Sequence, residues 1–392
     1  MEIRELVEQE YEAAVERRHY IHRHPELSFQ EYKTTDYIQK LMEEWGIPYE
    51  RLQSGTGLAA WLTGEEQGRT IAFRADIDAL PIVEDTGLPF ASENEGVMHG
   101  CGHDMHTANL LGFAHILSTH RELVKGKVKF LFQPAEELFP GGSRSIIGEG
   151  YLDDVDAIYG LHVRPGMLYN EVSAGKGGIY AGSTVYKIRI KGKGGHGSAP
   201  STAVDPIVAA AGVVNALQTI VSRNVNPLDA LVVSTCIIRS GSKGNIIPED
   251  AYLEGQFRCY KEEVKDLAIK RIRQIAESIS EGYGCSAEVT FEEGYAPVTN
   301  HDENVDVITA AIQKIGDIRM NEQPPQLGGE DFGYYLRKTS GAFFNIGLQS
   351  SGEQEVVSLH NAHILMDDRA LRTGMEAFLG IYFEECGRYS QF

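Results

Sequence analysis

The sequence predicts an α/β protein in which a mostly parallel-stranded domain carries a smaller, inserted α+β domain. The chain has 392 residues, which exceeds the usual size of a single compact core. Short apolar runs alternate with helical patterns in the early and late parts of the sequence. In the middle section, by contrast, a predicted strand alternates between apolar and charged residues.

The N-terminal stretch is predicted to be helical. Val7, Tyr11 and His22 recur at helical spacing, and Pro25 ends the pattern. A second helix is expected from about residue 32 to residue 45.

Four short runs after these helices are predicted to be buried strands. Each run is apolar nearly throughout and rich in β-branched or aromatic residues, which is typical of parallel strands covered by helices. The runs are Ile71–Arg74, Val128–Gln133, Ala157–Leu161 and Ala342–Ile346.

Residues 184–292 are predicted to form the inserted domain. Its first strand, Thr184–Lys191, alternates between apolar and basic residues, and Asp205 then caps an apolar helix. Further strands and a long amphipathic helix complete a β-α-β-β-α-β order, which is the split ferredoxin-like arrangement. The first domain comprises residues 1–183 and 293–392.

Composition excludes some classes of function. The net charge of -20 argues against a nucleic-acid-binding surface, which requires a basic face. No apolar run approaches the roughly 20 residues of a membrane span, so no membrane partner is expected. The five cysteines are scattered and contain no CxxC pair, which favours a reducing cytoplasm over a disulfide scaffold.

Polar side chains follow the predicted parallel strands at the points where the strands end. In open α/β sheets, ligands bind outside the carboxyl ends of the strands. The first strand leads into Asp76 and Asp78, the second into Glu136 and Glu137, and the third into His162. Cys101 and His103 lie between the first two strands, and His360 follows the last.

These side chains are predicted to bind metal. Thiolate, imidazole and carboxylate donors together suit Zn, Mn, Co or Ni rather than Mg or Ca. One divalent ion takes about four ligands, so five donors predict two ions per subunit that share a bridge, roughly 3.5–4 Å apart. The predicted ligands are Cys101, His103, Glu137, His162 and His360.

The two neighbouring glutamates suggest a division of roles. Adjacent side chains in an extended segment point to opposite sides, so both are not expected to bind one ion in the same way. We assign Glu137 as a ligand and Glu136 as the general base that deprotonates a metal-bound water.

A cysteine nucleophile is the alternative chemistry for this cluster. Cys101 could attack a substrate with His103 as its base. This hypothesis leaves the two glutamates and the two remaining histidines without a role, so the metal site is favoured.

Six motifs resemble one family. They occur in the family's order and span nearly the whole chain. The sequence resembles the amidohydrolase branch of the dinuclear metallopeptidases, which includes hippurate hydrolases, auxin-conjugate hydrolases and N-acetyldiaminopimelate deacetylases. Aminoacylases and carboxypeptidase G are more distant relatives. The motifs are DIDALP (76–81), HGCGHDMH (99–106), QPAEE (133–137), GLHV (160–163), GKGGHGSAP (192–200) and GGEDFGYY (328–335).

The resemblance implies metal-dependent hydrolysis of the amide bond of small N-acyl amino acids, with a metal-bound water as the nucleophile. It also implies that the inserted domain is a lid that mediates dimerisation, so a homodimer or a higher homo-oligomer is expected. A dipeptidase or carboxypeptidase on the same two-metal site is the alternative activity. A non-catalytic binding module on this fold is a second alternative.

The resemblance also assigns further residues. Asp78 is expected to orient a metal ligand from behind the site. His196 is expected to stabilise the oxyanion of the reacting carbonyl, and in related enzymes this histidine comes from the partner subunit. Asn245 and Arg258 resemble residues that contact the carboxylate end of the substrate, although a structural ion pair is an alternative role for Arg258.

Overall fold

The computed structural model describes residues 2–352 and 355–387. The chain forms two compact units. The first comprises Met1–Gly177, Thr299–Pro324 and Asp331–Phe392, and the second comprises Gly178–Val298 and Pro325–Glu330. The predicted limits of the inserted domain, residues 184 and 292, lie inside the second unit.

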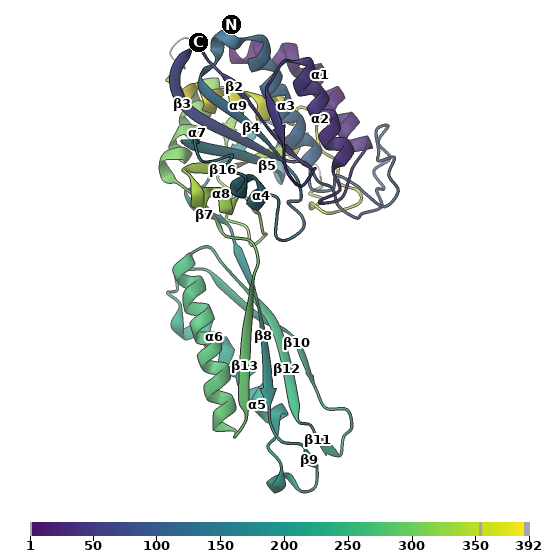
Figure 1. Ribbon diagram of the computed structural model, residues 1–392, viewed down its shortest axis with the longest axis vertical. Coiled ribbons are helices and arrows are strands. Elements are labelled where there is room, and N and C mark those ends of the chain that lie inside the picture. Colours follow the sequence, from purple (N-terminus) through teal and green to yellow (C-terminus); the bar gives the residue numbers. More distant parts are fainter. Residues whose placement is uncertain (1, 353–354, 388–392) are drawn as a thin grey trace. The chain divides into compact units, whose positions relative to one another are not determined.

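Within the described ranges, the first unit is built around an eight-stranded sheet (Figure 1). Strands β4, β3, β5 and β16 are neighbours in this order and run parallel, and each contains one of the four predicted runs. The prediction of a large, mostly parallel sheet is therefore confirmed. The strands are β1 (Tyr49–Arg51), β2 (Leu58–Thr63), β3 (Glu66–Asp76), β4 (Lys125–Gln133), β5 (Ala157–Leu168), β6 (Glu171–Ser173), β15 (Arg319–Met320) and β16 (Gly341–Gln349).

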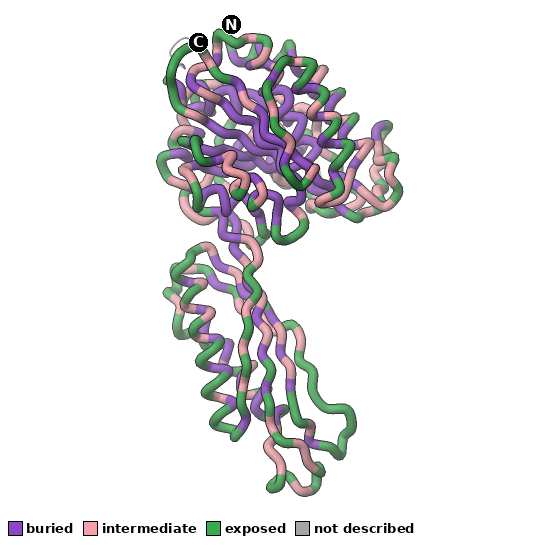
Figure 2. The backbone as a smooth tube through the Cα atoms, in the orientation of Figure 1, coloured by how far each residue is buried: buried purple, intermediate pink, exposed green. Residues whose placement is uncertain are grey.

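Helices cover this sheet, and its central strands are buried nearly throughout. The middle of this unit is accordingly coloured as buried in Figure 2. Phe73, Phe130 and Tyr159 share one face and belong to the core that α1, α3 and α9 also form. Asp76 and His162 therefore lie on the opposite face, at the carboxyl ends of their strands. The helices are α1 (Ile3–Arg23), α2 (Tyr32–Glu44), α3 (His103–Thr119), α4 (Ser143–Gly148), α7 (Asp302–Ile315), α8 (Gly333–Lys338) and α9 (Ala370–Glu385).

The second unit is an antiparallel sheet in the order β10-β12-β8-β13, with α5 and α6 packed on it. The chain order β8-α5-β10-β12-α6-β13 together with this strand order is the ferredoxin-like arrangement. In β8, Tyr186, Ile188 and Ile190 are fully buried and belong to the core of the unit. The elements are β8 (Gly182–Lys191), α5 (Pro206–Thr219), β10 (Leu231–Ser240), β12 (Asp250–Cys259), α6 (Glu262–Gly282) and β13 (Ser286–Glu293).

Helix α5 begins as its sequence predicts. Asp205 Oδ1 accepts a hydrogen bond from the backbone N–H of Ile207 at 2.8 Å, and Pro206 occupies the first helical position. In the described part of the chain, Pro206–Asn224 is the one helical stretch long and apolar enough to cross a membrane, by length and composition alone. The expectation of no run of that length is therefore wrong. Ala209, Val213 and Leu217 pack in the core of the unit, which accounts for part of this apolar character.

Candidate metal centre

The predicted donors from the first unit meet at the carboxyl ends of the parallel strands. Asp76 ends β3, and its register partner is Gln133, the last residue of β4. His162 in β5 lies opposite Asn345 in β16. Helix α3 begins at His103, so its first turn supplies a donor to the same edge.

Five predicted ligands and Glu136 form one connected cluster. The Sγ atom of Cys101 lies 3.4 Å from His162 Nε2 and 3.3 Å from His360 Nε2. His360 Nε2 lies 3.2 Å from Glu137 Oε1. Three overlapping groups, in each of which all donor atoms lie within 4.8 Å of one another, link the set: Cys101, His103 and His162; Cys101, Glu137 and His360; His103, Glu136 and Glu137.

His103 shows that this donor set suits a metal ion. Its Nε2 atom is buried and has no hydrogen-bond partner in the described residues, although carboxylate oxygens of Glu137 and Glu136 lie 3.8 and 4.0 Å away. These separations are too long for hydrogen bonds. Two ligands bonded at about 2.1 Å to one tetrahedral ion are about 3.4 Å apart. The observed separations are closer to this spacing than to the length of a hydrogen bond, so the atoms are better placed to share an ion than to contact each other.

Asp78 fixes the orientation of His103. Its Oδ1 atom lies 3.0 Å from His103 Nδ1, which leaves Nε2 directed at the cluster. Its Oδ2 atom accepts the backbone N–H of Glu137 at 2.9 Å and the hydroxyl of Ser28 at 2.7 Å. This carboxylate–imidazole arrangement is typical of metal sites, and the carboxylate here also holds the backbone of a second predicted ligand.

The charged groups around His103 also favour a bound cation. Burial by itself lowers the pKa of His103, but the carboxylates of Asp76, Asp78 and Glu137 raise it to about 10. The buried cluster therefore carries an excess of negative charge, which a bound cation would neutralise.

His162 has the neutral form that a metal ligand needs. Its Nδ1 atom lies 2.7 Å from the carbonyl oxygen of Val163, so Nδ1 donates the proton and the Nε2 lone pair faces Cys101. Burial, together with neighbouring His106, holds the pKa of His162 well below its ordinary value. The imidazole is thus uncharged, as metal coordination requires.

The cysteine nucleophile is disfavoured by the same geometry. Cys101 contacts His162 and His360, whereas His103 directs its Nδ1 atom to Asp78. Burial and the nearby Glu137 carboxylate raise the pKa of the Cys101 thiol well above its ordinary value. Nucleophilic attack needs the thiolate, so this environment suppresses it in the absence of an ion.

One premise of the glutamate assignment is wrong. The segment after β4 is bent rather than extended at residues 136–138, and Ala135 directly before it has a positive φ of 52°. Both carboxylates consequently approach the same atom, His103 Nε2. Glu137 also lies near His360, and Glu136 is 5% exposed. The division of roles between these two residues stays a prediction.

Sequence reasoning missed a buried network behind the donors. Arg74 is fully buried, and its guanidinium donates to Asp76 Oδ2 at 2.6 Å, Asp331 Oδ1 at 2.8 Å and Gln133 Oε1 at 2.9 Å. Burial opposes ionisation of Asp76, but Arg74 and nearby imidazoles hold its pKa well below the ordinary range. An arginine inside an otherwise apolar strand was the available signal, because a buried guanidinium needs acidic partners.

His106 belongs to this network rather than to the predicted ligand set. Its Nδ1 atom lies 2.6 Å from Asp76 Oδ1, and its Nε2 atom accepts the backbone N–H of Val163 at 2.9 Å. Both ring nitrogens are therefore occupied, so His106 has no lone pair left for an ion. Its role is to fix the positions of its two partners.

The predicted substrate residues lie in the second unit. His196 is exposed in β9 (Gly195–His196), which pairs with β11 (Ile246–Ile247). Asn245 is its neighbour, since the carbonyl oxygen of Asn245 accepts the Gly197 N–H at 2.9 Å. Arg258 in β12 donates to the carbonyl oxygen of Leu327 at 2.7 Å and makes no ion pair that we observe in the described residues.

His196 and Arg258 occupy opposite ends of this unit. The segment that carries His196 follows the end of β8, where Lys191 pairs with Asp250 at the start of β12. Arg258 lies eight residues further along β12, which at about 3.3 Å per residue is roughly 26 Å away. Figure 1 shows β9 and β11 at one end of the unit.

A set of thiolate, imidazole and carboxylate donors at the carboxyl edge of an α/β sheet is typical of a metal-dependent enzyme. Comparison with known proteins agrees with this class. The chain belongs to peptidase family M20/M25/M40, whose profile matches residues 72–383. It is a metal-dependent amidohydrolase.

Two relatives and one solved structure illustrate the similarity. The N-acetyl-L-cysteine deacetylase of Bacillus subtilis (strain 168) is 39% identical over 354 residues, which are 90% of this chain and 83% of that protein. Thermostable carboxypeptidase 1 of Saccharolobus solfataricus is 36% identical over 368 residues, 93% of each chain. A Bacillus subtilis protein described as a dinuclear metal binding peptidase of the M20 family has a TM-score of 0.86 at 34% identity, covering 97% of this chain and 99% of that one.

Proposed function

We propose that this protein hydrolyses the amide bond of N-acyl amino acids at a centre of two divalent ions. One observation carries the proposal: the unpaired, buried Nε2 atom of His103 lies among carboxylate oxygens at distances that suit ion coordination. The relative named N-acetyl-L-cysteine deacetylase supports the substrate class. The proposed ligands are Cys101, His103, Glu137, His162 and His360, with Mn, Zn, Co or Ni as the ions.

The residues of the chain divide the chemistry between them. Ions bound here would lower the pKa of water and polarise the substrate carbonyl. Glu136 takes the proton from the attacking water and returns it to the leaving nitrogen. Its burial beside the donors suits this role, because a carboxylate shielded from bulk water keeps the proton near the reacting atoms. Asp78 keeps His103 and the backbone of Glu137 in place.

The variant Glu136→Ala tests the catalytic assignment. The activity panel should contain N-acetyl, N-benzoyl and indole-acyl amino acids with added Mn, Zn, Co or Ni. We expect the variant to lose turnover by at least about 100-fold, in line with general-base contributions, while it keeps the metal content of the wild type. Retained turnover would overturn the role of Glu136.

A matched pair of histidines tests the ligand assignment. His360→Ala should lower bound metal. His363→Ala should not, because His363 contacts Asp85 and, unlike His360, does not lie near Cys101 and Glu137. Equal metal content in both variants would remove His360 from the ligand set.

A carboxypeptidase activity on the same centre is the second candidate. The relative named as a thermostable carboxypeptidase favours it. Dipeptides and blocked peptides assayed beside the N-acyl amino acids decide between the two, since the preferred substrate is the one with the higher kcat/KM.

We further propose that the second unit acts as a lid and joins two copies of the chain. Opposite placement of His196 and Arg258 supports this, because the ends of the unit that carry them are separated by roughly 26 Å along β12, which is too far for both to hold one small substrate within a single subunit. In the proposed dimer, His196 of one copy serves the other copy's centre as an oxyanion donor. Asn245 accompanies His196, and Arg258 binds the substrate's carboxylate end.

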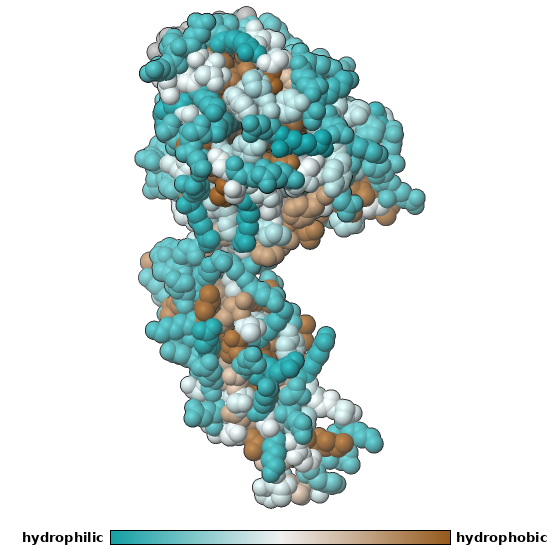
Figure 3. All heavy atoms as spheres, in the orientation of Figure 1, coloured by the Kyte–Doolittle hydropathy of each residue, from teal (hydrophilic) through white to brown (hydrophobic). Residues whose placement is uncertain are grey.

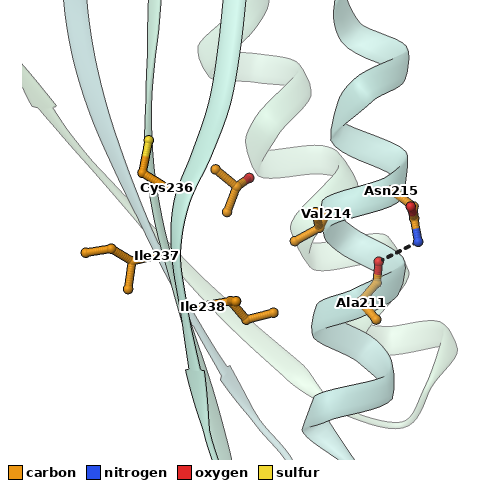
Figure 4. A pocket seen from close by; sticks show the side chains of 7 residues that line it. Ala211, Val214, Asn215, Cys236, Ile237 and Ile238 are labelled. Atoms are coloured by element: carbon orange, nitrogen blue, oxygen red, sulfur yellow. Dashed lines mark hydrogen bonds between the residues drawn. The ribbon is translucent and has the colours of Figure 1, made fainter.

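The surface around β10 supports a second copy as the partner. β10 is an edge strand of its sheet, and a groove between it and α5 is lined by apolar side chains including Val214, Ile237 and Ile238 (Figure 4). Val232 and Ile238 are 41% and 58% exposed, and apolar side chains reach the surface of this unit in patches (Figure 3). Ile238→Lys should convert a dimer to a monomer in light scattering and should lower activity, because the partner's histidine is then lost.

We also propose a cytoplasmic location. None of the five cysteines forms a disulfide, and four of them are buried, which suits a reducing compartment. Fractionation of cells that express the tagged chain would test this.

A further inference from the structure

Glu31 is a buried carboxylate that the proposed mechanism does not use. It lies just before α2 and is 0% exposed. Its Oε1 atom accepts a hydrogen bond from the backbone N–H of Ala135 at 2.7 Å. The two residues are 104 positions apart in the sequence, so this contact ties the N-terminal segment to the loop after β4.

Ala135 is the residue at which this loop turns. It directly precedes Glu136 and has a φ of 52°, a left-handed conformation that residues with a side chain adopt rarely. Its carbonyl oxygen accepts the N–H of Gly142 at 3.1 Å. Such a conformation persists only where surrounding contacts hold it, and the hydrogen bond from the Ala135 N–H to the Glu31 carboxyl group is one of these contacts.

The backbone on the other side of Glu136 is held in the same way. The N–H of Glu137 donates to Asp78 Oδ2 at 2.9 Å. Two buried carboxylates, Glu31 and Asp78, therefore accept the N–H groups of the residues before and after Glu136. With both neighbours held, the backbone of Glu136 has little freedom, so its side chain is directed toward His103.

We propose that Glu31 is a positioning residue for the general base, acting through the backbone N–H of Ala135; this rests on the proposed role of Glu136. Reaction rates depend steeply on the placement of catalytic groups, and an error of about 1 Å can cost about 100-fold. Loss of the Glu31 contact lets the turn at Ala135 relax and moves Glu136 away from its working position. Substrate affinity and the ion ligands are affected less, because Asp78 still holds Glu137.

The alternative role for Glu31 is purely structural. Glu26 provides the matched control for it, because it lies in the same segment and its Oε2 atom accepts the N–H of Thr34 at 2.8 Å. Glu26→Ala thus removes a carboxylate-to-backbone hydrogen bond from the same segment without touching the loop of Glu136. Glu31→Gln keeps an oxygen acceptor for Ala135 and tests rescue.

The experiment compares Glu31→Ala, Glu31→Gln and Glu26→Ala in the metal-loaded enzyme. We expect Glu31→Ala to lower kcat by about 10- to 100-fold, with KM within about threefold and metal content unchanged. The kcat of Glu31→Gln and the kcat of Glu26→Ala should each lie within about threefold of the wild-type value. Equal losses of kcat in the two alanine variants, or a loss confined to KM, would overturn the proposal.

Amide hydrogen exchange provides a readout independent of activity. The peptide covering residues 134–142 should exchange faster in Glu31→Ala than in the wild type and in Glu26→Ala, because the Ala135 N–H has lost its acceptor. Unchanged exchange would overturn the proposal even if kcat falls. If Glu31→Ala does not fold, Glu31→Asp, which withdraws the carboxylate by one methylene, should show the same changes to a smaller degree. If the wild-type protein shows no hydrolytic activity, the proposed function is refuted. Hydrogen exchange in Glu31→Ala and Glu26→Ala still tests whether Glu31 holds the Ala135 N–H, because this measurement does not depend on activity.

Discussion

Asp78→Asn changes one oxygen of a carboxylate that holds two predicted metal ligands. Asp78 accepts three hydrogen bonds, from the His103 ring, the Glu137 backbone and the Ser28 hydroxyl. Asparagine replaces one acceptor oxygen by an NH₂ donor. In one orientation this donor faces the His103 Nδ1–H group, and in the other it faces the Glu137 N–H group, so a donor meets a donor either way.

The expected loss follows from these contacts. Hydrogen bonds to charged groups contribute about 1.5–3 kcal/mol each. Removal of the partner behind a metal-bound imidazole costs about 10- to 100-fold in metal affinity, or ~1.4–2.8 kcal/mol. We therefore expect Asp78→Asn to bind its ions about 10- to 100-fold more weakly than the wild type. Ser28→Ala removes only the hydroxyl contact and leaves the contacts of Asp78 with His103 and Glu137 in place, so it should weaken metal binding less than Asp78→Asn does.

Competition with a chelating dye, with Mn or Zn added to metal-free protein, measures both affinities. Circular dichroism at the same temperature verifies that each variant is folded. Asp78→Asn with an affinity within twofold of the wild type would refute the argument, and so would equal losses in Asp78→Asn and Ser28→Ala.

Three further predictions concern stability. Arg74→Met leaves Asp76 and Asp331 buried without the arginine that pairs with both, so its free energy of unfolding should be about 3–5 kcal/mol lower than that of the wild type. Thermal or urea denaturation measures this difference, and an unchanged Tm would contradict the prediction. Burial raises the pKa of Glu376 to about 7 from its ordinary 4.5, so its ionisation destabilises the fold increasingly as pH rises through this range. The free energy of unfolding of Glu376→Gln should therefore exceed that of the wild type by up to about 3 kcal/mol at pH 8 and equal it at pH 4. A difference in Tm between the two proteins that does not change with pH would contradict this prediction. Added Mn or Zn at 100 times its Kd should stabilise the metal-free wild type by about 2.7 kcal/mol, and the same metal concentration should stabilise Cys101→Ala less. Equal stabilisation of the two proteins by the metal would count against Cys101 as a ligand.

Features of the fold that depend on neighbouring residues in the chain could be predicted from the sequence. Apolar runs located all four central parallel strands, and the polar residues that end them met at one edge of the sheet as expected. The capped start of α5 at Asp205 was likewise visible in two adjacent residues.

Contacts made at long range could not be found in the same way. Ser28 and Glu31 look like ordinary polar residues, because their partners Asp78 and Ala135 are 50 and 104 positions away. The bend at Ala135 was missed because nothing in Gln-Pro-Ala-Glu-Glu requires a left-handed alanine; tertiary contacts impose it.

The position of β16 has a consequence for synthesis of the chain. This strand, residues 341–349, lies between β5 and β6 in the finished sheet, yet the whole second unit is translated before it. Until it emerges from the ribosome, β5 has an open, apolar edge of the kind that pairs with other chains. Truncation before residue 341 should consequently yield an aggregating product, because the sheet is completed only when β16 pairs with β5 late in synthesis.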